Sequence, residues 1–222
     1  RKKFENATFK SFSWIPEENY IDEAAFYELD YIVHLAGENL GAKRWSKKQK
    51  KKIYDSRVKT AELLFEKLSS LKINLKAFVS ASAVGIYPTF SQGEEYYIEK
   101  DMYGTGFTAQ VCIAWEKAAD NFKNAGIRTV KIRTGLVQDK KDPALAKILM
   151  MSKFGIIPVF GRGKQYYPWI HIDDLVNIYV AAIENENFED PFNAVAPDFV
   201  TNEQYAQTLK SVLGKKIIMH IP

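Results

Sequence analysis

The stretch YIVHLAGEN, residues 31–39, decides the fold, because a run of apolar, β-rich residues ends there in a glycine. The same arrangement returns in SASAVGIY (80–87) and in RTGLV (133–137), with segments of helical period in between. Strands that alternate with helices predict a parallel sheet that is covered on both faces. Ligands of such sheets bind beyond the carboxyl ends of the strands, so these stretches mark the expected binding edge.

The hydrophobic period predicts an alternation of strands and helices along the whole chain. The expected strands cover residues 31–36, 76–82, 128–134, 191–196 and 216–221. The expected helices cover residues 45–71, 106–125, 142–154, 172–185 and 201–214. Gly126 is expected to close the helix that precedes it. The last two helices are expected to begin at side-chain caps, Asp173 or Asp174 in one and Thr201 or Asn202 in the other.

The composition is that of an ordinary globular protein, since 46% of the 222 residues are hydrophobic and 26% are charged. No apolar run approaches the ~20 residues that span a bilayer, and the opening RKKFENATFK lacks the apolar centre of a signal peptide. The single cysteine, Cys112, stands among apolar residues, where a buried thiol is expected, and it allows no internal disulfide. We therefore expect a cytoplasmic protein with no membrane partner.

Positive charge is concentrated in one segment, AKRWSKKQKKK (42–52), although the net charge is only +4. The segment fits a solvated helix face, and it also fits attraction to a phosphate of a cofactor or substrate. No recognition motif accompanies it, so we expect no nucleic-acid partner. The histidines lie far apart, which predicts no metal site, and His34 is expected in the core because it lies inside an apolar run.

Several motifs together resemble a known family, namely AGENLGAKRW, SRVKTAELL, SASAVGIY, AWEKAA and NAVAP followed by TNEQYAQTL. Over nearly its whole length the chain resembles the atypical branch of the extended short-chain dehydrogenase/reductases. That branch is labelled NAD-dependent epimerase/dehydratase-like, or SulA-like nucleotide-binding. The resemblance implies a doubly wound, Rossmann-like α/β fold that binds NADP or NAD, and the basic segment slightly favours NADP. It also implies a nucleotide-binding core over residues 1–140 and a mixed α/β substrate-side region over residues 141–222, with one late strand returning to the sheet.

The chain departs from this family at its start. Members begin with a strand and a glycine-rich turn, whose helix N-terminus holds the cofactor pyrophosphate. Here the sequence opens with NATFKSFSWIP (6–16), which resembles a later edge strand of the same half of the fold. We therefore expect the first βα unit with its glycine-rich turn, about forty residues, to be missing from this sequence.

A second departure concerns the catalytic Tyr-x-x-x-Lys pair that the resemblance implies. Its expected positions hold Phe107 and Val111, or Thr108 and Cys112, and neither pair titrates usefully. Tyr103 stands one helical turn before Phe107, but no lysine follows it at that spacing. We therefore expect the usual mechanism of the family not to apply.

The substrate side also differs from that of the sugar-nucleotide enzymes in this family. The arginine that grips the substrate diphosphate in those enzymes is replaced by Tyr167, with Arg162 as an alternative cation. We expect an NAD(P)-dependent oxidoreductase or epimerase-like protein with an unidentified small-molecule substrate. The alternatives are a non-catalytic nucleotide-binding sensor or partner-binding protein, and a purely structural descendant. By analogy with relatives, helices 45–71 and 106–125 are expected to support a homodimer.

The candidate catalytic residues are Ser82 and Tyr87. Ser82 matches the catalytic serine of the family or caps a strand end, and Tyr87 is a stand-in proton donor or a packing tyrosine. Arg57 is expected to contact a phosphate or to pair with Asp55 or Glu62. Arg133 is expected to form a structural ion pair or to cap a helix. The residues expected to bind the cofactor lie at the strand ends or beside them, and they are Leu35, Ala36, Gly37, Arg57, Ser80, Ala81, Thr134, Gly135, Leu136 and Val137.

Overall fold

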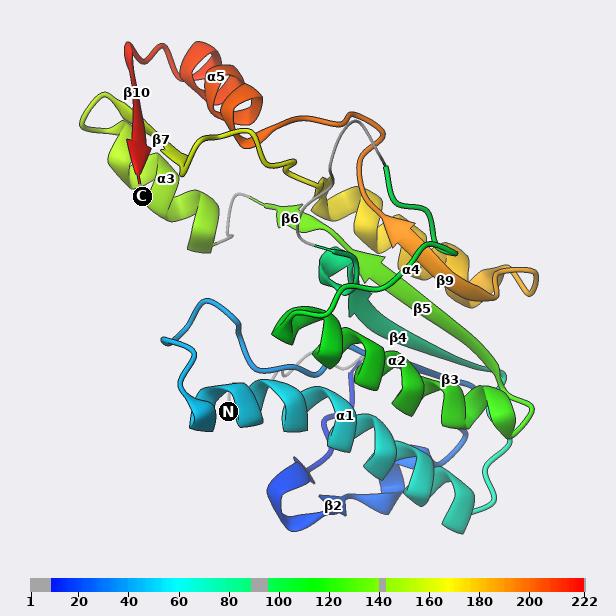
Figure 1. Ribbon diagram of the computed structural model, residues 1–222. Coiled ribbons are helices and arrows are strands. Elements are labelled where there is room, and N and C mark those ends of the chain that lie inside the picture. Colours follow the sequence, from blue (N-terminus) through cyan, green and yellow to red (C-terminus); the bar gives the residue numbers. More distant parts are fainter. Residues whose placement is uncertain (1–8, 89–95, 140–142, 222) are drawn as a thin grey trace.

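The computed structural model describes residues 9–88, 96–139 and 143–221 of the chain. Its centre is a four-stranded sheet in the order β3-β4-β5-β9, in which all neighbouring strands run parallel (Figure 1). The strands of this sheet are β3 (Tyr31–His34), β4 (Ala77–Ala83), β5 (Arg128–Thr134) and β9 (Asp190–Ala194). The expectation of a parallel sheet in an α/β fold is therefore confirmed.

Helices cover both faces of this sheet (Figure 1). Helices α1 (Lys47–Ser70) and α2 (Phe107–Asn124) lie on one face, and α4 (Ile172–Glu184) lies on the other. Beneath α1 and α2, the rings of Phe78 and Phe122 stack with their centroids 3.7 Å apart. Beneath α4, Val130 and Ile132 pack in one cluster with Leu175. The doubly wound arrangement thus rests on separate cores above and below the sheet.

The ends of α1 and α2 are set by local sequence signals. The Ser46 side chain accepts a hydrogen bond from the Gln49 amide and begins α1. Beyond α2, Gly126 has a φ of +83°, a left-handed conformation that glycine adopts without strain. The Ile127 amide then donates to the Phe122 carbonyl at 3.0 Å, which completes the Schellman motif. The expected closing glycine is confirmed.

A second group of elements lies beyond the end to which β5 points (Figure 1). It contains α3 (Pro143–Ser152), β7 (Ile156–Phe160), α5 (Asn202–Val212) and β10 (Ile217–Ile221). Strand β10 pairs in parallel with β7, and a further pair joins β6 (Leu136–Gln138) to β8 (Trp169–His171). Helix α5 begins with a capping box in which Thr201 and Gln204 exchange hydrogen bonds, as the sequence predicted for Thr201.

Two local expectations were wrong. Helix α4 is capped by His171, whose Nδ1 accepts from the Asp173 amide at 3.2 Å, and Asp173 and Asp174 lie inside its first turn. The stretch NATFKSFSWIP supplies no strand to the central sheet in its described part, residues 9–16. Instead, β1 (Trp14–Ile15) pairs antiparallel with β2 (Tyr20–Ile21), because the chain turns back directly after Pro16. Residues 6–8 lie outside the described residues.

Strand β9 comes from the second half of the chain and pairs with β5 in the central sheet. The division into units 1–140 and 141–222 stays a prediction, and so does the homodimer. Residue 142, the expected first residue of α3, lies outside the described ranges. Within those ranges, no helix is both long enough and apolar enough to cross a membrane.

Candidate functional site

A buried ion pair lies at the carboxyl ends of β4 and β5. Arg133, next to last in β5, is 0% exposed, and Glu116, in the middle of α2, is 6% exposed. The Arg133 Nε and Nη2 atoms donate to the two carboxylate oxygens of Glu116 at 2.8 and 2.9 Å, which is a bidentate pair. Burial alone would lower the pKa of Arg133, but the hydrogen bonds and charge of Glu116 outweigh it and raise that pKa. Arg133 therefore has the ion-pair role that the sequence predicted.

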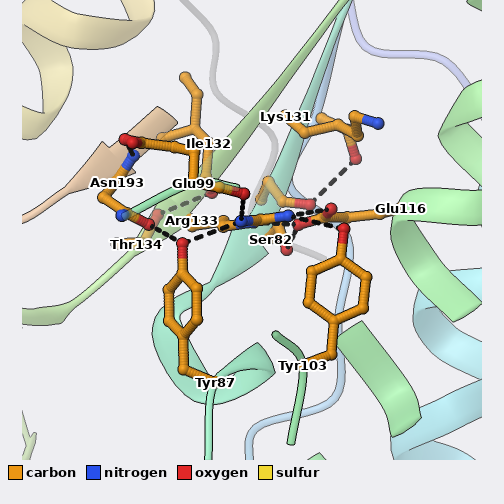
Figure 2. Close-up of polar contacts among 12 residues, drawn as sticks. Ser82, Tyr87, Glu99, Tyr103, Glu116, Lys131, Ile132, Arg133, Thr134 and Asn193 are labelled. Atoms are coloured by element: carbon orange, nitrogen blue, oxygen red, sulfur yellow. Dashed lines mark hydrogen bonds and ion pairs between the residues drawn. The ribbon is translucent and has the colours of Figure 1, made fainter. Parts of the chain in front are cut away.

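The rest of the guanidinium is also fully bonded (Figure 2). Its Nη1 donates to the Tyr87 hydroxyl at 2.8 Å and to the Glu99 carbonyl at 3.0 Å. Its Nη2 donates to the Tyr103 hydroxyl at 3.3 Å. Arginine carries five N–H donors, and all five find partners inside the protein. We call Arg133, Glu116, Ser82, Tyr87 and Tyr103 the guanidinium cluster.

Both candidate catalytic residues belong to this cluster. The Ser82 hydroxyl donates to Glu116 Oε1 at 2.7 Å, and Ser82 is only 3% exposed. The Tyr87 hydroxyl donates to Asn193 Oδ1 at 2.7 Å, and burial raises the pKa of Tyr87, partly opposed by Arg133. The structure thus brings Ser82 and Tyr87 together, with each hydroxyl proton directed to a protein acceptor. Their catalytic role stays a prediction.

The predicted cofactor residues differ in how far they are exposed and in whether they already have partners within the protein. Leu35 and Leu136, which follow β3 and begin β6, are 62% and 45% exposed at the carboxyl edge. Ser80 is 1% exposed and donates its hydroxyl to the Ala81 carbonyl, so it is committed within the protein. A Cβ at Gly135 would lie 2.5 Å from the Pro168 carbonyl oxygen, so this glycine permits a close approach of two protein segments. The remaining residues of the set at the strand ends are Ala36, Gly37, Ala81, Thr134 and Val137, which are half-buried or exposed.

Arg57 projects from α1 toward the segment that follows β3. Its Nη1 donates to the carbonyls of Glu38 and Ile53 at 3.1 and 3.0 Å. A Cβ at Gly37 would lie 2.9 Å from Arg57 Cζ, so the glycine makes room for the guanidinium. Nε and Nη2 of Arg57 have no hydrogen-bond partner among the described residues. Asp55, one of its expected partners, pairs with Lys51 and Lys59 instead.

His34 lies beside this region and is a fully bonded core residue, as expected. The Trp115 indole N–H, which can only donate, points to His34 Nδ1 at 3.4 Å. The other ring nitrogen, Nε2, therefore carries the proton and donates to Thr60 Oγ1 at 2.9 Å. Burial, assisted by the charge of Arg57, lowers the pKa of His34 to about 4. His34 is thus held neutral.

The positions that the resemblance assigns to the catalytic pair are occupied by packed side chains. The Phe107 ring meets Trp45 edge-on with centroids 5.4 Å apart, and Lys50 Nζ lies 4.9 Å from its centroid. Cys112 is buried, and burial followed by the charge of Glu116 raises its thiol pKa to about 11. The expectation of an inert, buried thiol is confirmed. Within the described ranges, no three His, Cys, Asp or Glu side chains gather as a metal site would require.

Sequence reasoning did not assign Glu116, Tyr103, Glu99 or Asn193 to the site. For Glu116 there was a signal, because a carboxylate one turn after Cys112 lies on the buried side of α2 and needs a partner there. For Asn193 there was none, since its backbone N–H donates to Glu99 Oε1 from 94 residues away in the sequence. Contacts of this kind depend on the fold and not on any local pattern.

Comparisons with known proteins agree with this architecture. Residues 6–195 match the model of the NAD dependent epimerase/dehydratase family. An epimerase family protein of Mycobacterium leprae is 32% identical over 216 residues, which cover 97% of this chain and 69% of the relative. The human epimerase family protein SDR39U1 is 32% identical over 195 residues, 87% of this chain and 66% of the relative.

Solved structures show the same relationship. A crystal structure of human SDR39U1 isoform 2 with NADPH has a TM-score of 0.80 at 31% identity, covering 88% of this chain and 66% of that one. A nucleoside-diphosphate sugar epimerase from Corynebacterium glutamicum has a TM-score of 0.72 at 31% identity, covering 95% of this chain and 44% of that one. The fold is thus that of the Rossmann-like extended short-chain dehydrogenase/reductases. The chain belongs to the NAD dependent epimerase/dehydratase family.

Proposed function

We propose that this protein is an NADP(H)-dependent oxidoreductase that binds its dinucleotide across the carboxyl ends of β3, β4 and β5. The observation that carries the proposal is the relative with a TM-score of 0.80 and 31% identity, which was solved with NADPH. The small residues at the ends of these strands support it, because a flat dinucleotide lies at this edge in doubly wound sheets. The basic segment at the start of α1 favours the additional phosphate of NADP.

The donors of Arg57 fit a dinucleotide. Two of its nitrogen atoms are free of described partners, while Nη1 anchors the guanidinium to carbonyls on either side. The absence of a side chain at Gly37 leaves the guanidinium beside the backbone that follows β3. Burial lowers the pKa of Arg57, but an arginine keeps its charge in proteins. Arg57 would therefore hold a phosphate or a ribose hydroxyl at this edge.

The proposal is tested by calorimetric titration of NADPH into the full-length gene product and its Arg57→Gln variant. Because hydrogen bonds to charged groups contribute about 1.5–3 kcal/mol, the dissociation constant is expected to rise at least about tenfold. The control variant, Lys210→Gln, removes a positive charge from α5 and should bind as the wild type does. Equal affinity in all three proteins would remove Arg57 from the proposed site.

A second function is a nucleotide-binding sensor without turnover. The observation in its favour is that the hydroxyl protons of Ser82 and Tyr87 are both directed to protein acceptors. A sensor would bind NADPH with the same dependence on Arg57, but it would not oxidise NADPH with any carbonyl compound. Stoichiometric release of a reduced product would exclude it.

A further inference from the structure

Tyr103 is the exposed member of the guanidinium cluster. It is 47% exposed, whereas Ser82, Tyr87, Glu116 and Arg133 are each 7% exposed or less. Figure 2 shows the rings of Tyr87 and Tyr103 both directing their hydroxyls at the guanidinium. The Arg133 Cζ atom lies 5.3 and 5.4 Å from the centroids of these two rings. Of the two tyrosines, Tyr103 is the one that solvent or a ligand reaches.

The hydrogen bonds around Tyr103 leave its hydroxyl proton without an acceptor among the described residues. Arginine has donors and no acceptors, so the Tyr103 oxygen accepts from Arg133 Nη2. Its own O–H must then be directed elsewhere, and it has no acceptor among the described residues. The O–H of Tyr87, which also accepts from Arg133, ends instead on Asn193. The Tyr103 O–H is therefore the hydroxyl donor that this cluster leaves open.

The segment that carries Tyr103 is fixed against the turn that follows β4. The next residue, Gly104, donates its amide to the Ile86 carbonyl at 2.8 Å. A Cβ at Gly104 would lie 2.7 Å from the Tyr87 carbonyl oxygen, so the two backbones touch where only glycine fits. Tyr103 is thereby held at the carboxyl edge of the sheet, just before α2 begins. This is the edge at which the dinucleotide is proposed to bind.

We propose that Tyr103 is the catalytic proton donor of this site, that Arg133 positions it, and that the substrate is a neutral carbonyl compound. The inference rests on the proposed function. The group that donates to the tyrosine oxygen comes from β5, instead of from a lysine one turn further along α2. A phenol whose oxygen accepts from a guanidinium is a stronger donor through its own O–H.

The proposed step is the reduction of a carbonyl group to an alcohol. Bound NADPH would supply a hydride, with both electrons, to the carbonyl carbon. The carbonyl π bond opens onto oxygen, and Tyr103 Oη transfers its proton to that oxygen, which gives an alcohol. The resulting phenolate accepts from Arg133 Nη2 and takes a new proton from water, which reaches it because the side chain is half exposed.

The hydrogen bonds of Arg133 favour a substrate without charge. All five N–H groups of Arg133 are used inside the protein, and its charge is balanced by Glu116 at 2.8 Å. The guanidinium therefore offers no donor to a carboxylate or phosphate. A ligand oxygen over this cluster meets one neutral O–H, which suits the carbonyl of a ketone, an aldehyde or a quinone.

The test compares wild type, Tyr103→Phe and Tyr27→Phe in the full-length protein, with phenanthrenequinone as the probe. Tyr27 is a 78% exposed tyrosine on the segment before β3, so its loss is the matched control. In Tyr103→Phe, we expect kcat for NADPH oxidation to fall about 100-fold or more, because general acids contribute that much. NADPH affinity should stay within about twofold of wild type, since Tyr103 acts on the substrate and not on the cofactor.

A second readout needs no cofactor. Binding of phenanthrenequinone to the NADPH-free protein should weaken about two- to tenfold in Tyr103→Phe, the loss of one hydrogen bond, and should not change in Tyr27→Phe. Unchanged quinone binding and unchanged kcat in Tyr103→Phe would overturn the inference, and so would a preference of the wild type for pyruvate over the quinone. A wild type that binds no NADPH would refute the proposed function, while quinone binding would still decide whether Tyr103 is the donor.

Discussion

The two faces of the central sheet are built from the same strands but from different chemistry. Toward α4, β4 and β5 present Val79, Val130 and Ile132, which pack in an apolar cluster. On the face that α1 and α2 cover, the carboxyl ends of β4 and β5 carry Ser82 and Arg133. Both side chains are hydrogen-bonded to Glu116. Because side chains alternate along a strand, one sequence such as RTVKIRT serves both faces. Both faces have an apolar core, but the α1–α2 face, which we call the polar face, also positions charged and polar groups at the edge of the sheet.

The largest expected effect is on the polar face. Arg133→Met leaves the Glu116 carboxylate buried without its partner, so the free energy of unfolding should fall by about 3–5 kcal/mol. Urea denaturation followed by circular dichroism measures this loss. The double variant Arg133→Met with Glu116→Leu should recover most of it, since neither charge then remains buried. A loss below about 1 kcal/mol in the single variant would show that the pair is solvated.

The second effect is pH-dependent and arises from His34 on the same face. Its pKa is lowered to about 4 in the folded state, so between pH 6.5 and 4 the unfolded chain binds a proton that the folded chain does not. Stability should therefore be complete above pH 6.5 and fall by about 3 kcal/mol as the pH drops to 4.

Urea midpoints across this pH range measure the effect of His34. The variant His34→Gln should lose this part of the pH dependence, while His220→Gln, at an exposed position on β10, should keep it. Parallel pH profiles for wild type and His34→Gln would contradict the assignment.

A smaller effect is expected at Ser82. Ser82→Ala removes a hydrogen bond to a buried carboxylate, which should lower the free energy of unfolding by about 1.5–3 kcal/mol. As a candidate catalytic residue, it should also lower turnover at least tenfold, about 1.4 kcal/mol of barrier. Urea denaturation measures the loss of stability, and steady-state kinetics with NADPH and phenanthrenequinone measure the loss of turnover. Turnover that survives the change intact would leave Ser82 with a structural role only.

The smallest effect belongs to the face that α4 covers. Ile132→Val removes one methylene from the cluster beneath α4 and should cost about 0.5–1.5 kcal/mol at every pH. NADPH affinity and turnover should not change, because Ile132 points away from the guanidinium cluster. A change in either quantity at unchanged fold would mean that the two faces are coupled.

Local sequence patterns predicted most of the elements of the fold. The periods of residues 31–36, 76–82 and 128–134 predicted β3, β4 and β5, and a glycine at position 126 predicted the end of α2. The cap of α4 was misjudged because histidine is not a usual N-cap residue, whereas two aspartates follow it. Strands β6, β7 and β8 were not predicted, since β6 and β8 have three residues each and β7 contains Pro158.

The site was predictable only in part. Small residues at the strand ends predicted a binding edge, and the resemblance predicted a role for Ser82. The partners of Arg133 could not be read from the sequence, because Glu116, Tyr87 and Tyr103 reach it from different elements. The spacing of Tyr103 drew attention to a lysine that is absent, whereas the cation comes from a neighbouring strand 30 residues later.

The measurement that tests the central claim most directly is a calorimetric titration of NADPH and of NADH into the full-length protein. The account predicts one saturable site per chain and tighter binding of NADPH, because the basic start of α1 and Arg57 attract the additional phosphate. Absence of binding for both nucleotides would contradict the account and leave the polar face of the sheet as a structural feature only.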